Sequence, residues 1–253
     1  MNTNALQVYL IGRPQSGKST AFAALVGDPE GGHRRVTEVP DRRLDHLNDI
    51  FTPRKRTPAE IIFCDIFAQK AAELTGRQAE RFTAALGDAD MLAIVIACFG
   101  DLDSDGKPVD PVRALDEVIL ELVVADHGVV ERRLERVEKD IKKGLKDAAT
   151  EKDVLQRCLP VLEAEQPLST LGLSADELKL LRSFQLLTLK PLLVLANVPE
   201  DQAAAPPPAA LLEYATGKGL KTVAFCAQLE AEIAGLDPEE GEAFLADYAI
   251  TES

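Results

Sequence analysis

Short apolar runs, separated by polar and helical segments, recur along the chain and predict a sheet covered by helices. Leu6–Ile11, Met91–Phe99 and Leu192–Ala196 contain almost only apolar residues. Strands that are apolar throughout are typical of parallel sheets, because both of their faces are buried. Glu60–Ile66 and Thr222–Cys226 supply two further strands. Strands that alternate with helical segments predict an α/β fold with a doubly wound, mostly parallel sheet.

Helix and loop signals fill most of the segments between these strands. A helix is expected after the first strand, and others over Asp41–Ile50 and Gln78–Leu86, where apolar residues recur at helical spacing. Gly27–Arg35 is rich in glycine and is expected to be a loop. Ala203–Ala210 contains three consecutive prolines and is expected to be a surface loop before a helix.

The middle of the chain lacks strand signals and predicts an inserted helical hairpin. Apolar residues recur there at spacings of four and three, at Val130, Leu134, Val137, Ile141 and Leu145. This spacing is typical of an amphipathic or coiled-coil helix. A turn near Gly144–Thr150 precedes a second arm, which carries Leu155, Cys158 and Leu162. Ser174 and Glu177 have the spacing of a capping box, which predicts a third helix.

The interruption divides the chain into two expected domains. Residues 1–110 and 185–253 would form the α/β domain, and residues 111–184 would form the helical, coiled-coil insertion. The insertion is either a packing appendage or an arm that contacts a partner.

Composition narrows the class of protein further. The chain has 253 residues, 46% of them apolar, and a formal net charge of −14. So acidic a chain is a poor candidate for non-specific nucleic-acid binding as a whole. It has no apolar run of about 18 residues and no export signal at its start, which predicts a cytoplasmic protein without membrane segments.

Cysteine and histidine do not suggest a metal site. The four cysteines include no CxxC pair, and the three histidines are scattered without a cysteine at ligand spacing. Reduced thiols packed as small core residues are the expected state. The cysteines are Cys64, Cys98, Cys158 and Cys226, and the histidines are His33, His46 and His127.

A glycine-rich loop between the first strand and the first helix carries the strongest chemical signal. Gly12-Arg-Pro-Gln-Ser-Gly-Lys-Ser19 fits the pattern GxxxxGK[ST]. In such a loop the glycines let successive N–H groups face phosphate oxygens, and the following helix points its positive end at the same anion. Lys18 would contact the β and γ phosphates as a binding and candidate catalytic residue, and Ser19 would bind Mg²⁺. The expected phosphate-binding residues are Gly12, Arg13, Pro14, Gln15, Ser16, Gly17, Lys18, Ser19 and Thr20.

A second metal-binding residue is expected at the end of another strand. Asp65 ends the Glu60–Ile66 run. A carboxylate in that position of a P-loop protein holds Mg²⁺ through its water shell. The alternative is an aspartate that caps a helix or a turn.

Eight motifs spread over nearly the whole chain resemble the YchF/Obg-like ATPases, a branch of the translation-factor class of P-loop GTPases. They are Gly12–Thr20, Val39–Asp45, Cys64–Ile66, Ala97–Phe99, Cys158–Glu163, Leu187–Pro191, Ala196–Glu200 and Cys226–Ile233. The resemblance implies a Ras-like domain with a coiled-coil insertion and association with ribosomes. The family also has a small C-terminal β-rich TGS domain, which this chain lacks, so we expect a divergent, shortened relative or a truncated form.

The resemblance also implies how the nucleotide base is recognised. GTPases read guanine with Asn-Lys-x-Asp, whereas this chain has Asn197-Val198-Pro-Glu200. Glutamate is one methylene longer, so the paired hydrogen bonds to guanine would be misplaced. We therefore expect ATP to be favoured over GTP. Phe99 is either an aromatic contact of the base or a core residue, and Cys226-Ala227-Gln228 matches the last base-side loop.

The sequence departs from the family at both switch regions. The segment Ala21–Val39 is short, so the threonine of the first switch has only Thr37 as a candidate. The motif Asp-x-x-Gly appears as Asp65–Ala68, and Ala68 restricts the backbone where glycine is usual. Gln69 follows and is either a catalytic residue that positions water or an ordinary solvated glutamine.

Two functions therefore remain open. One is a Mg²⁺-dependent nucleotide-binding protein, with slow NTPase activity, that acts as a switch associated with the ribosome or with translation. The other is a hydrolysis-deficient nucleotide-binding module, a monomer, whose arm binds a partner such as RNA. A small-molecule kinase would need a lid of catalytic arginines, which the sequence does not offer.

The charge of the predicted arm is mixed. Its basic residues are Arg132, Arg133, Arg136, Lys139, Lys142, Lys143 and Lys146, and its interleaved acidic residues are Glu131, Glu135, Glu138, Asp140 and Asp147. The arm is thus either an RNA-binding surface or a solvated coiled-coil face.

Overall fold

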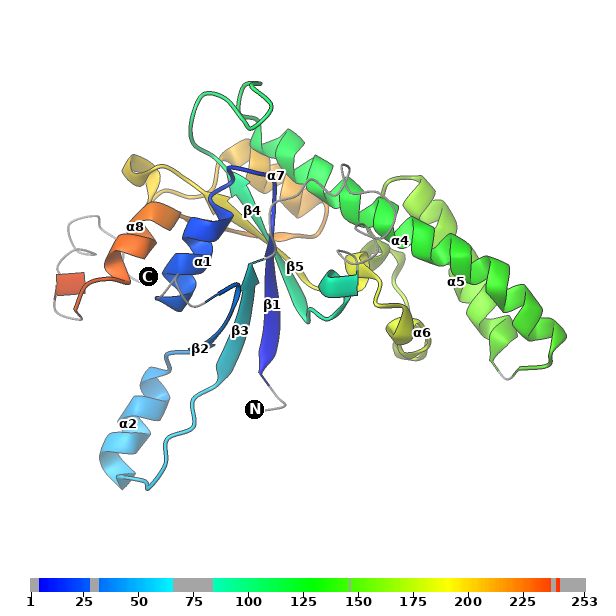
Figure 1. Cartoon of the computed structure of the whole chain (residues 1–253), viewed down its shortest axis with the longest axis horizontal. Coiled ribbons are helices and arrows are strands. Elements are labelled where there is room, and N and C mark those ends of the chain that lie inside the picture. The colour runs from blue at the N-terminus through cyan, green and yellow to red at the C-terminus, as the bar shows by residue number, and fades with distance from the viewer. Residues whose placement is uncertain (1–4, 28–31, 66–83, 146, 238–239, 242–253) are drawn as a thin grey trace.

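The computed structural model describes residues 5–27, 32–65, 84–145, 147–237 and 240–241. It contains a sheet flanked by helices, from which a helical hairpin and one short helix project (Figure 1). The strands are β1 (Leu6–Ile11), β2 (Arg34–Glu38), β3 (Glu60–Asp65), β4 (Met91–Ala97), β5 (Leu192–Asn197) and β6 (Lys221–Phe225). The α-helices are α1 (Lys18–Val26), α2 (Arg42–Phe51), α4 (Pro111–Lys142), α5 (Ala148–Glu163), α6 (Ala175–Leu181), α7 (Ala209–Gly217) and α8 (Ala227–Ile233).

The six strands form one sheet in the order β2-β3-β1-β4-β5-β6. β1 lies inside the sheet and pairs in parallel with β3 and with β4. β4, β5 and β6 continue the parallel pairing, which confirms the predicted α/β fold with a mostly parallel sheet. The carboxyl ends of β1, β3, β4, β5 and β6 therefore lie along the same edge of the sheet, where open α/β sheets bind their ligands.

The edge strand β2 was not predicted. It pairs antiparallel with β3, in the register Arg34 with Cys64 and Glu38 with Glu60. The expected loop over Gly27–Arg35 is therefore wrong at its end, since Arg34 and Arg35 already belong to the strand. The strand was missed because it is short and mostly polar, which an edge position with one partner permits.

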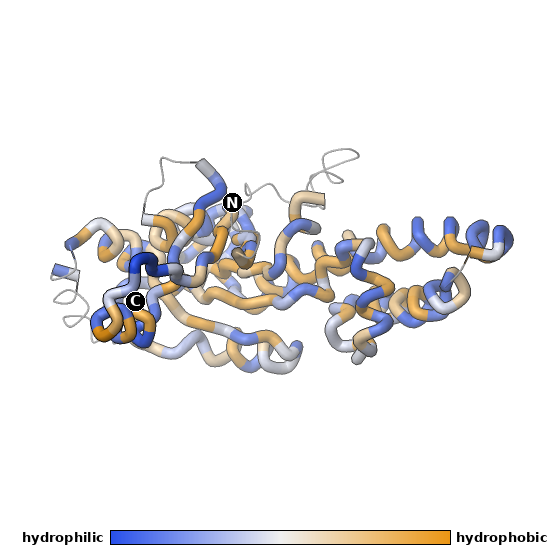
Figure 2. Tube along the Cα trace, turned by 90° about the horizontal axis from the view of Figure 1, so that it is seen from below, coloured by the Kyte–Doolittle hydropathy of each residue, from blue (hydrophilic) through white to orange (hydrophobic). Residues whose placement is uncertain are grey.

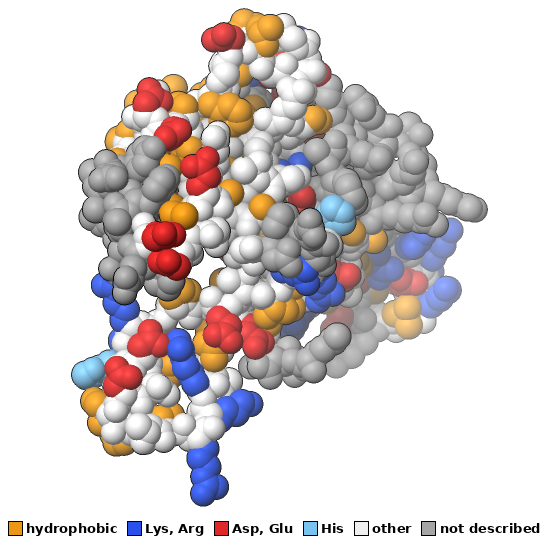
Figure 3. Space-filling model, turned by 60° about the vertical axis from the view of Figure 1, so that its left-hand side comes forward, with side chains coloured by type: hydrophobic (Ala, Val, Ile, Leu, Met, Phe, Trp, Pro, Cys, Tyr) orange, Lys and Arg blue, Asp and Glu red, His pale blue; other side chains and the backbone are white. Residues whose placement is uncertain are grey.

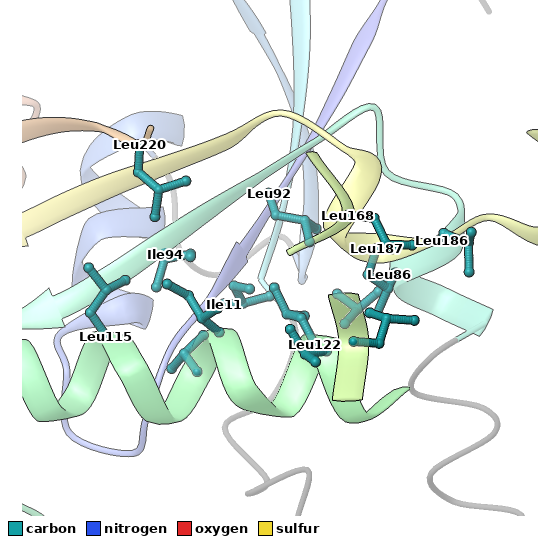
Figure 4. Packing of buried hydrophobic residues seen from close by; sticks show 14 of the residues in the cluster. Ile11, Leu86, Leu92, Ile94, Leu115, Leu122, Leu168, Leu186, Leu187 and Leu220 are labelled. Atoms are coloured by element: carbon teal, nitrogen blue, oxygen red, sulfur yellow. The ribbon is translucent and has the colours of Figure 1, made fainter. Parts of the chain in front are cut away.

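Helices cover both faces of the sheet. Val8 and Leu10 of β1 pack with Ala21 and Phe22 of α1 and with Ala227 of α8 on one face. The opposite face holds the larger core, to which α4 and α7 contribute. In Figure 4, leucines of α4 point toward the apolar side chains of the sheet on this face. The buried residues labelled there include Ile11, Leu92, Ile94, Leu115, Leu122 and Leu220.

Helices α4 and α5 form the predicted hairpin. They are joined at residues 143–147 and extend together to one end of the molecule, where hydrophilic residues are frequent (Figure 2). Val130 and Val137 of α4 and Leu155 and Cys158 of α5 are buried. Among the described residues between Pro111 and Arg182 there is no strand, as expected. Coiled-coil geometry and the division into two domains remain predictions.

The remaining predicted elements are present wherever the structure describes their residues. Ser174 caps α6 and forms the expected capping box with Glu177. The proline-rich loop ends at Pro208, and α7 follows it. Of the helix predicted over Gln78–Leu86, residues 84–86 are described and are helical, and the rest lies outside the described residues. Within the described part of the chain, no helix combines the length and apolarity needed to cross a bilayer.

Candidate functional site

The Gly12–Ser19 loop connects β1 to α1 and has the backbone that its glycines permit. The backbone angle φ is 149° at Gly12, 64° at Gln15 and 86° at Gly17. A Cβ atom at Gly12 would lie 2.4 Å from the Val95 carbonyl oxygen, and one at Gly17 would lie 2.1 Å from Nδ2 of Asn197. Side chains are therefore excluded at both glycines by contact as well as by backbone angle.

Three functional groups meet at the start of α1. Lys18 is 5% exposed, and Oγ of Ser19 donates a hydrogen bond of 3.0 Å to Oδ2 of Asp65 at the end of β3. Burial lowers the pKa of Lys18, and the nearby Asp65 carboxylate opposes this effect. All three residues are predicted from the sequence for one site, and the structure brings them together.

The residues fit a magnesium ion. Oδ1 of Asp65 is buried and has no hydrogen-bond partner among the described residues, so a carboxylate oxygen remains for a ligand or a water molecule. Among the described residues, no group of three or more acidic, histidine or cysteine side chains is arranged so that it could hold a metal ion by itself. Mg²⁺ bound with phosphates needs no such cluster, because phosphate oxygens and water complete its shell. Ser19 and Asp65 would hold the ion, which would neutralise phosphate charge.

Asn197, at the end of β5, ties the phosphate loop to the base-side loops. Its Nδ2 donates a hydrogen bond of 3.1 Å to the carbonyl oxygen of Ser16. Its Oδ1 accepts one of 2.9 Å from the backbone N–H of Ala227. The side chain is buried, and the Phe99 ring lies close to the same place, 3.9 Å from a Cβ built at Gly17. These contacts gather the phosphate loop and the loops after β4, β5 and β6.

The other predicted base-side residues lie at the same edge of the sheet but differ in exposure. Val198 is buried, and its N–H donates to the carbonyl oxygen of Phe225. Glu200 begins the short helix η6 (Glu200–Gln202) and is exposed. Cys226 is buried at the start of α8. Gln228 is exposed and donates a hydrogen bond to Glu232.

Arg13 of the phosphate loop forms ion pairs that the sequence analysis missed. Its guanidinium contacts Asp105, at 2.5 Å, and Glu117 of α4. Arg113 of α4 pairs in turn with Asp103, at 2.6 Å. These contacts border a cavity of about 120 Å³ beside the phosphate loop, which Phe99 also lines. The acidic run that begins at Asp101 was the only signal for this network in the sequence.

Two predicted residues of the switch regions remain, Thr37 and Gln69. Thr37 is not a metal ligand, because its Oγ1 donates to the carbonyl oxygen of Leu25 and its strand partner is Ile61. Ile61 lies four residues before Asp65 on β3, about 13 Å from it. Gln69 and Ala68 lie outside the described residues.

The cysteines behave as expected. All four are free, and Cys64, Cys158 and Cys226 are buried. Burial raises the pKa of the Cys98 thiol, and that of Cys158, to about 11.

Comparison with known proteins agrees with this geometry. A family model described as "50S ribosome-binding GTPase" matches residues 7–157. The Ribosome-binding ATPase YchF of Bacillus subtilis is 34% identical over 98% of this chain and 73% of its own length. The Haemophilus influenzae protein of the same name is 35% identical over 96% of this chain and 71% of its own. The Schizosaccharomyces pombe YchF GTPase structure has a TM-score of 0.83 at 24% identity, over 99% of this chain and 73% of that chain.

The sheet order and the Gly12–Ser19 loop define a P-loop domain of the GTPase fold. Within this class, the sequence identity of 34% and 35% to two bacterial relatives, over almost the whole chain, indicates the family. The chain belongs to the YchF family.

Proposed function

We propose that the chain binds the Mg²⁺ complex of a purine nucleoside triphosphate at the Gly12–Ser19 loop. One observation carries the proposal: the Ser19 hydroxyl is paired with the buried Asp65 carboxylate beside the buried Lys18 ammonium. An ammonium group complements phosphate charge, and a hydroxyl with a carboxylate complements the cation that the phosphates carry. The family membership agrees with this reading.

ATP is proposed as the preferred nucleotide. The motif Asn197–Glu200 lacks the lysine and the aspartate with which GTPases read guanine. Asn197 holds the loops of Ser16 and Ala227 together, and its second N–H and second oxygen lone pair remain for the base. The two bacterial relatives are named as ATPases and the fission-yeast structure as a GTPase, so nucleotide preference has to be measured for this chain.

Calorimetric titration of ATP and of GTP, each with Mg²⁺, tests both statements. We expect ATP to bind at least about tenfold more tightly than GTP, a difference that misplaced paired hydrogen bonds can supply. Lys18→Ala should weaken ATP binding at least about tenfold, because a charge-assisted contact is lost. Equal affinities would refute the ATP assignment, and a Lys18→Ala variant that binds like the wild type would refute the site.

For turnover we propose slow hydrolysis that drives a switch associated with the ribosome. The relatives named above are ribosome-binding proteins, and both switch regions of this chain depart from the family's pattern. Single-turnover hydrolysis of ATP checks the rate. Fast turnover would refute the slow-switch proposal, and no turnover would favour the alternative of a hydrolysis-deficient binding module.

One observation favours that alternative as a second candidate. Arg132, Arg136, Lys139 and Lys143, which we call the basic stripe, follow one another at spacings of four, three and four along α4 and its C-cap. Side chains at these spacings share one face of a helix. All four are exposed, and none forms an ion pair with another described residue. We propose that the stripe contacts ribosomal RNA and that the chain acts as a cytoplasmic monomer.

A further inference from the structure

Helix α2 carries apolar side chains that no other described element covers. Leu47, Ile50 and Phe51 are 50%, 56% and 71% exposed. Leu44 lies on the same side of the helix, one turn before Leu47. These four residues are called the α2 stripe below. In Figure 1 the helix projects from the sheet at the end opposite to the loop between β1 and α1.

The sequence favours a helix whose stability depends on a contact. The apolar positions of α2 gather on one side, and within the described chain none of its ten residues is buried. A helix of this length is marginal in water, and most helices are stabilised by packing of their apolar face. Asp41 caps the helix by accepting a 2.9 Å hydrogen bond from the Arg43 N–H, which offsets only part of the deficit. A covering molecule would supply the missing contact.

Basic residues surround the α2 stripe. Arg43 borders it, and Arg54, Lys55 and Arg56 follow the helix directly. Arg54 and Lys55 form no ion pair with another described residue, whereas Arg56 pairs with Asp45 at 2.7 Å and Arg43 pairs with Asp41 at 2.9 Å. Figure 3 shows this lowest part of the molecule, with Lys and Arg side chains next to hydrophobic ones. In a chain with a net charge of −14, a locally basic rim calls for an acidic partner surface.

Other occupants fit these observations less well. A second copy of the chain would bury only one short helix against another, far below the roughly 1,600 Å² of a standard interface. A membrane surface favours helices with a basic polar face, whereas the polar face of α2 carries Asp45 and Asp49. RNA offers phosphates to the basic rim but little to the exposed leucine, isoleucine and phenylalanine.

We propose that α2 docks into an apolar groove, rimmed by aspartate and glutamate, on a protein of the ribosome. The spacing of Leu44, Leu47 and Phe51 is that of the anchors by which an amphipathic helix enters a hydrophobic groove. Arg54 and Lys55 then pair with the acidic rim. The inference rests on the proposed ribosome association and adds to it a second contact, separate from the basic stripe of α4.

The test compares two double variants for binding to purified 70S ribosomes by co-sedimentation. Leu47→Gln with Phe51→Gln replaces two of the four residues of the α2 stripe, and His46→Gln with Asp49→Gln changes the opposite face of the same helix as the matched control. We expect the stripe variant to bind ribosomes at least about tenfold more weakly, since two buried apolar anchors are lost. The control should stay within about twofold of the wild type, because exposed polar changes contribute little.

Calorimetry with ATP and circular dichroism establish that both variants are folded, since α2 lies away from the phosphate loop. Ribosome binding by the stripe variant that equals the wild type would overturn the docking inference and leave ribosome association intact. Absence of ribosome binding by the wild type would overturn both.

Two further measurements identify the occupant. Protein-free ribosomal RNA should bind the wild type and the stripe variant equally, and a stripe-dependent loss there would assign α2 to RNA and overturn the proposal. Sedimentation velocity of the protein alone should give the same mass for both variants. A wild-type dimer that the stripe variant disperses would assign the surface to self-association and overturn the proposal as well.

Discussion

At the scale of single residues, the phosphate loop is packed so closely at Gly17 that no side-chain atom can be added there. Gly17 approaches the Asn197 amide so closely that even a methyl group is excluded. Asn197 is held by two hydrogen bonds to different segments of the chain. A disturbance at Gly17 is therefore transmitted to the loops after β5 and β6.

Gly17→Ala should abolish measurable nucleotide binding and lower the melting temperature. The new Cβ would displace Asn197, and the positive φ of 86° adds strain. The matched control is Gly27→Ala, where φ is 69° but no atom lies within 4 Å of the new Cβ. The control should lose about 1 kcal/mol of stability and bind nucleotide normally. Calorimetry and thermal melting distinguish the two, and a Gly17→Ala variant that binds normally would contradict the described loop.

A buried carboxylate far from the phosphate loop predicts a pH dependence of stability. Asp126 of α4 is fully buried and accepts hydrogen bonds from the backbone N–H groups of Leu187 and Thr188 and from the Thr188 hydroxyl. Burial raises the pKa of Asp126 to about 6, against the effect of these hydrogen bonds. Because the folded pKa exceeds the unfolded value, the stability this group provides is present at low pH and lost as pH rises.

We expect the stability advantage of the wild type over Asp126→Asn to shrink by about 1 kcal/mol between pH 5.5 and 7.5. Asparagine does not titrate, so the variant removes this single contribution while all other groups titrate as before. Urea unfolding at several pH values provides the measurement. An advantage that grows with pH would show that Asp126 has a lowered pKa in the folded protein.

At the scale of elements, an arginine joins the two helices of the hairpin. Arg133 of α4 pairs with Glu151 of α5 and, at 3.0 Å, with Asp140 of its own helix. Its guanidinium also lies 5.6 Å from the centre of the Phe184 ring. Because Arg133 is engaged in these contacts, it does not belong to the basic stripe on the outer face.

Arg133→Gln should therefore destabilise the protein by about 1–2 kcal/mol, since a partly buried ion-pair network and an aromatic contact are lost together. The neighbouring Arg132→Gln should change stability by less than about 0.5 kcal/mol, because Arg132 is exposed. Denaturant unfolding of the two variants makes the comparison. Equal losses would mean that the Arg133 contacts contribute nothing beyond a surface charge.

Some of the strands and loops could be predicted from the sequence, and others could not. The parallel strands and the phosphate loop were predictable because β4 and its neighbours are apolar throughout and Gly12–Ser19 has a fixed pattern. β2 was not, since five mostly polar residues at an edge carry no such signature. The ion pair of Arg13 with Glu117 was not predictable either. Its two residues lie far apart in the sequence, and they meet only because of the way α4 packs.

At the scale of the whole molecule, α4 belongs to the sheet and to the hairpin at once. Leu115, Ile119 and Leu122 of α4 belong to the core that contains β4 residues, and the same core continues through Val130 to Leu155 of α5. We propose that the α/β domain of residues 1–110 and 185–253 functions with the first part of α4 attached.

This proposal predicts that the two ends of the hairpin respond differently to deletion. Replacing residues 134–155 with a short Gly/Ser linker should leave ATP binding within about threefold, because the removed part does not touch the site. Deleting residues 111–184 should abolish folding, since it uncovers one face of the sheet. Circular dichroism and calorimetry test both, and a folded, ATP-binding 111–184 deletion would establish the insertion as fully separable.

An uninterrupted α4 has a mechanical consequence. From Pro111 to Lys142 the helix runs without a break for 32 residues, a length of about 48 Å. Arg13 forms an ion pair with Glu117 near the N-terminal end of this helix, while the basic stripe lies toward its C-terminal end. A pivot of about 5° at the base would sweep the tip through roughly 4 Å, by the geometry of a rigid rod of that length. Displacements too small to rearrange the phosphate loop would thus be magnified to the width of an atom or more where the hairpin ends.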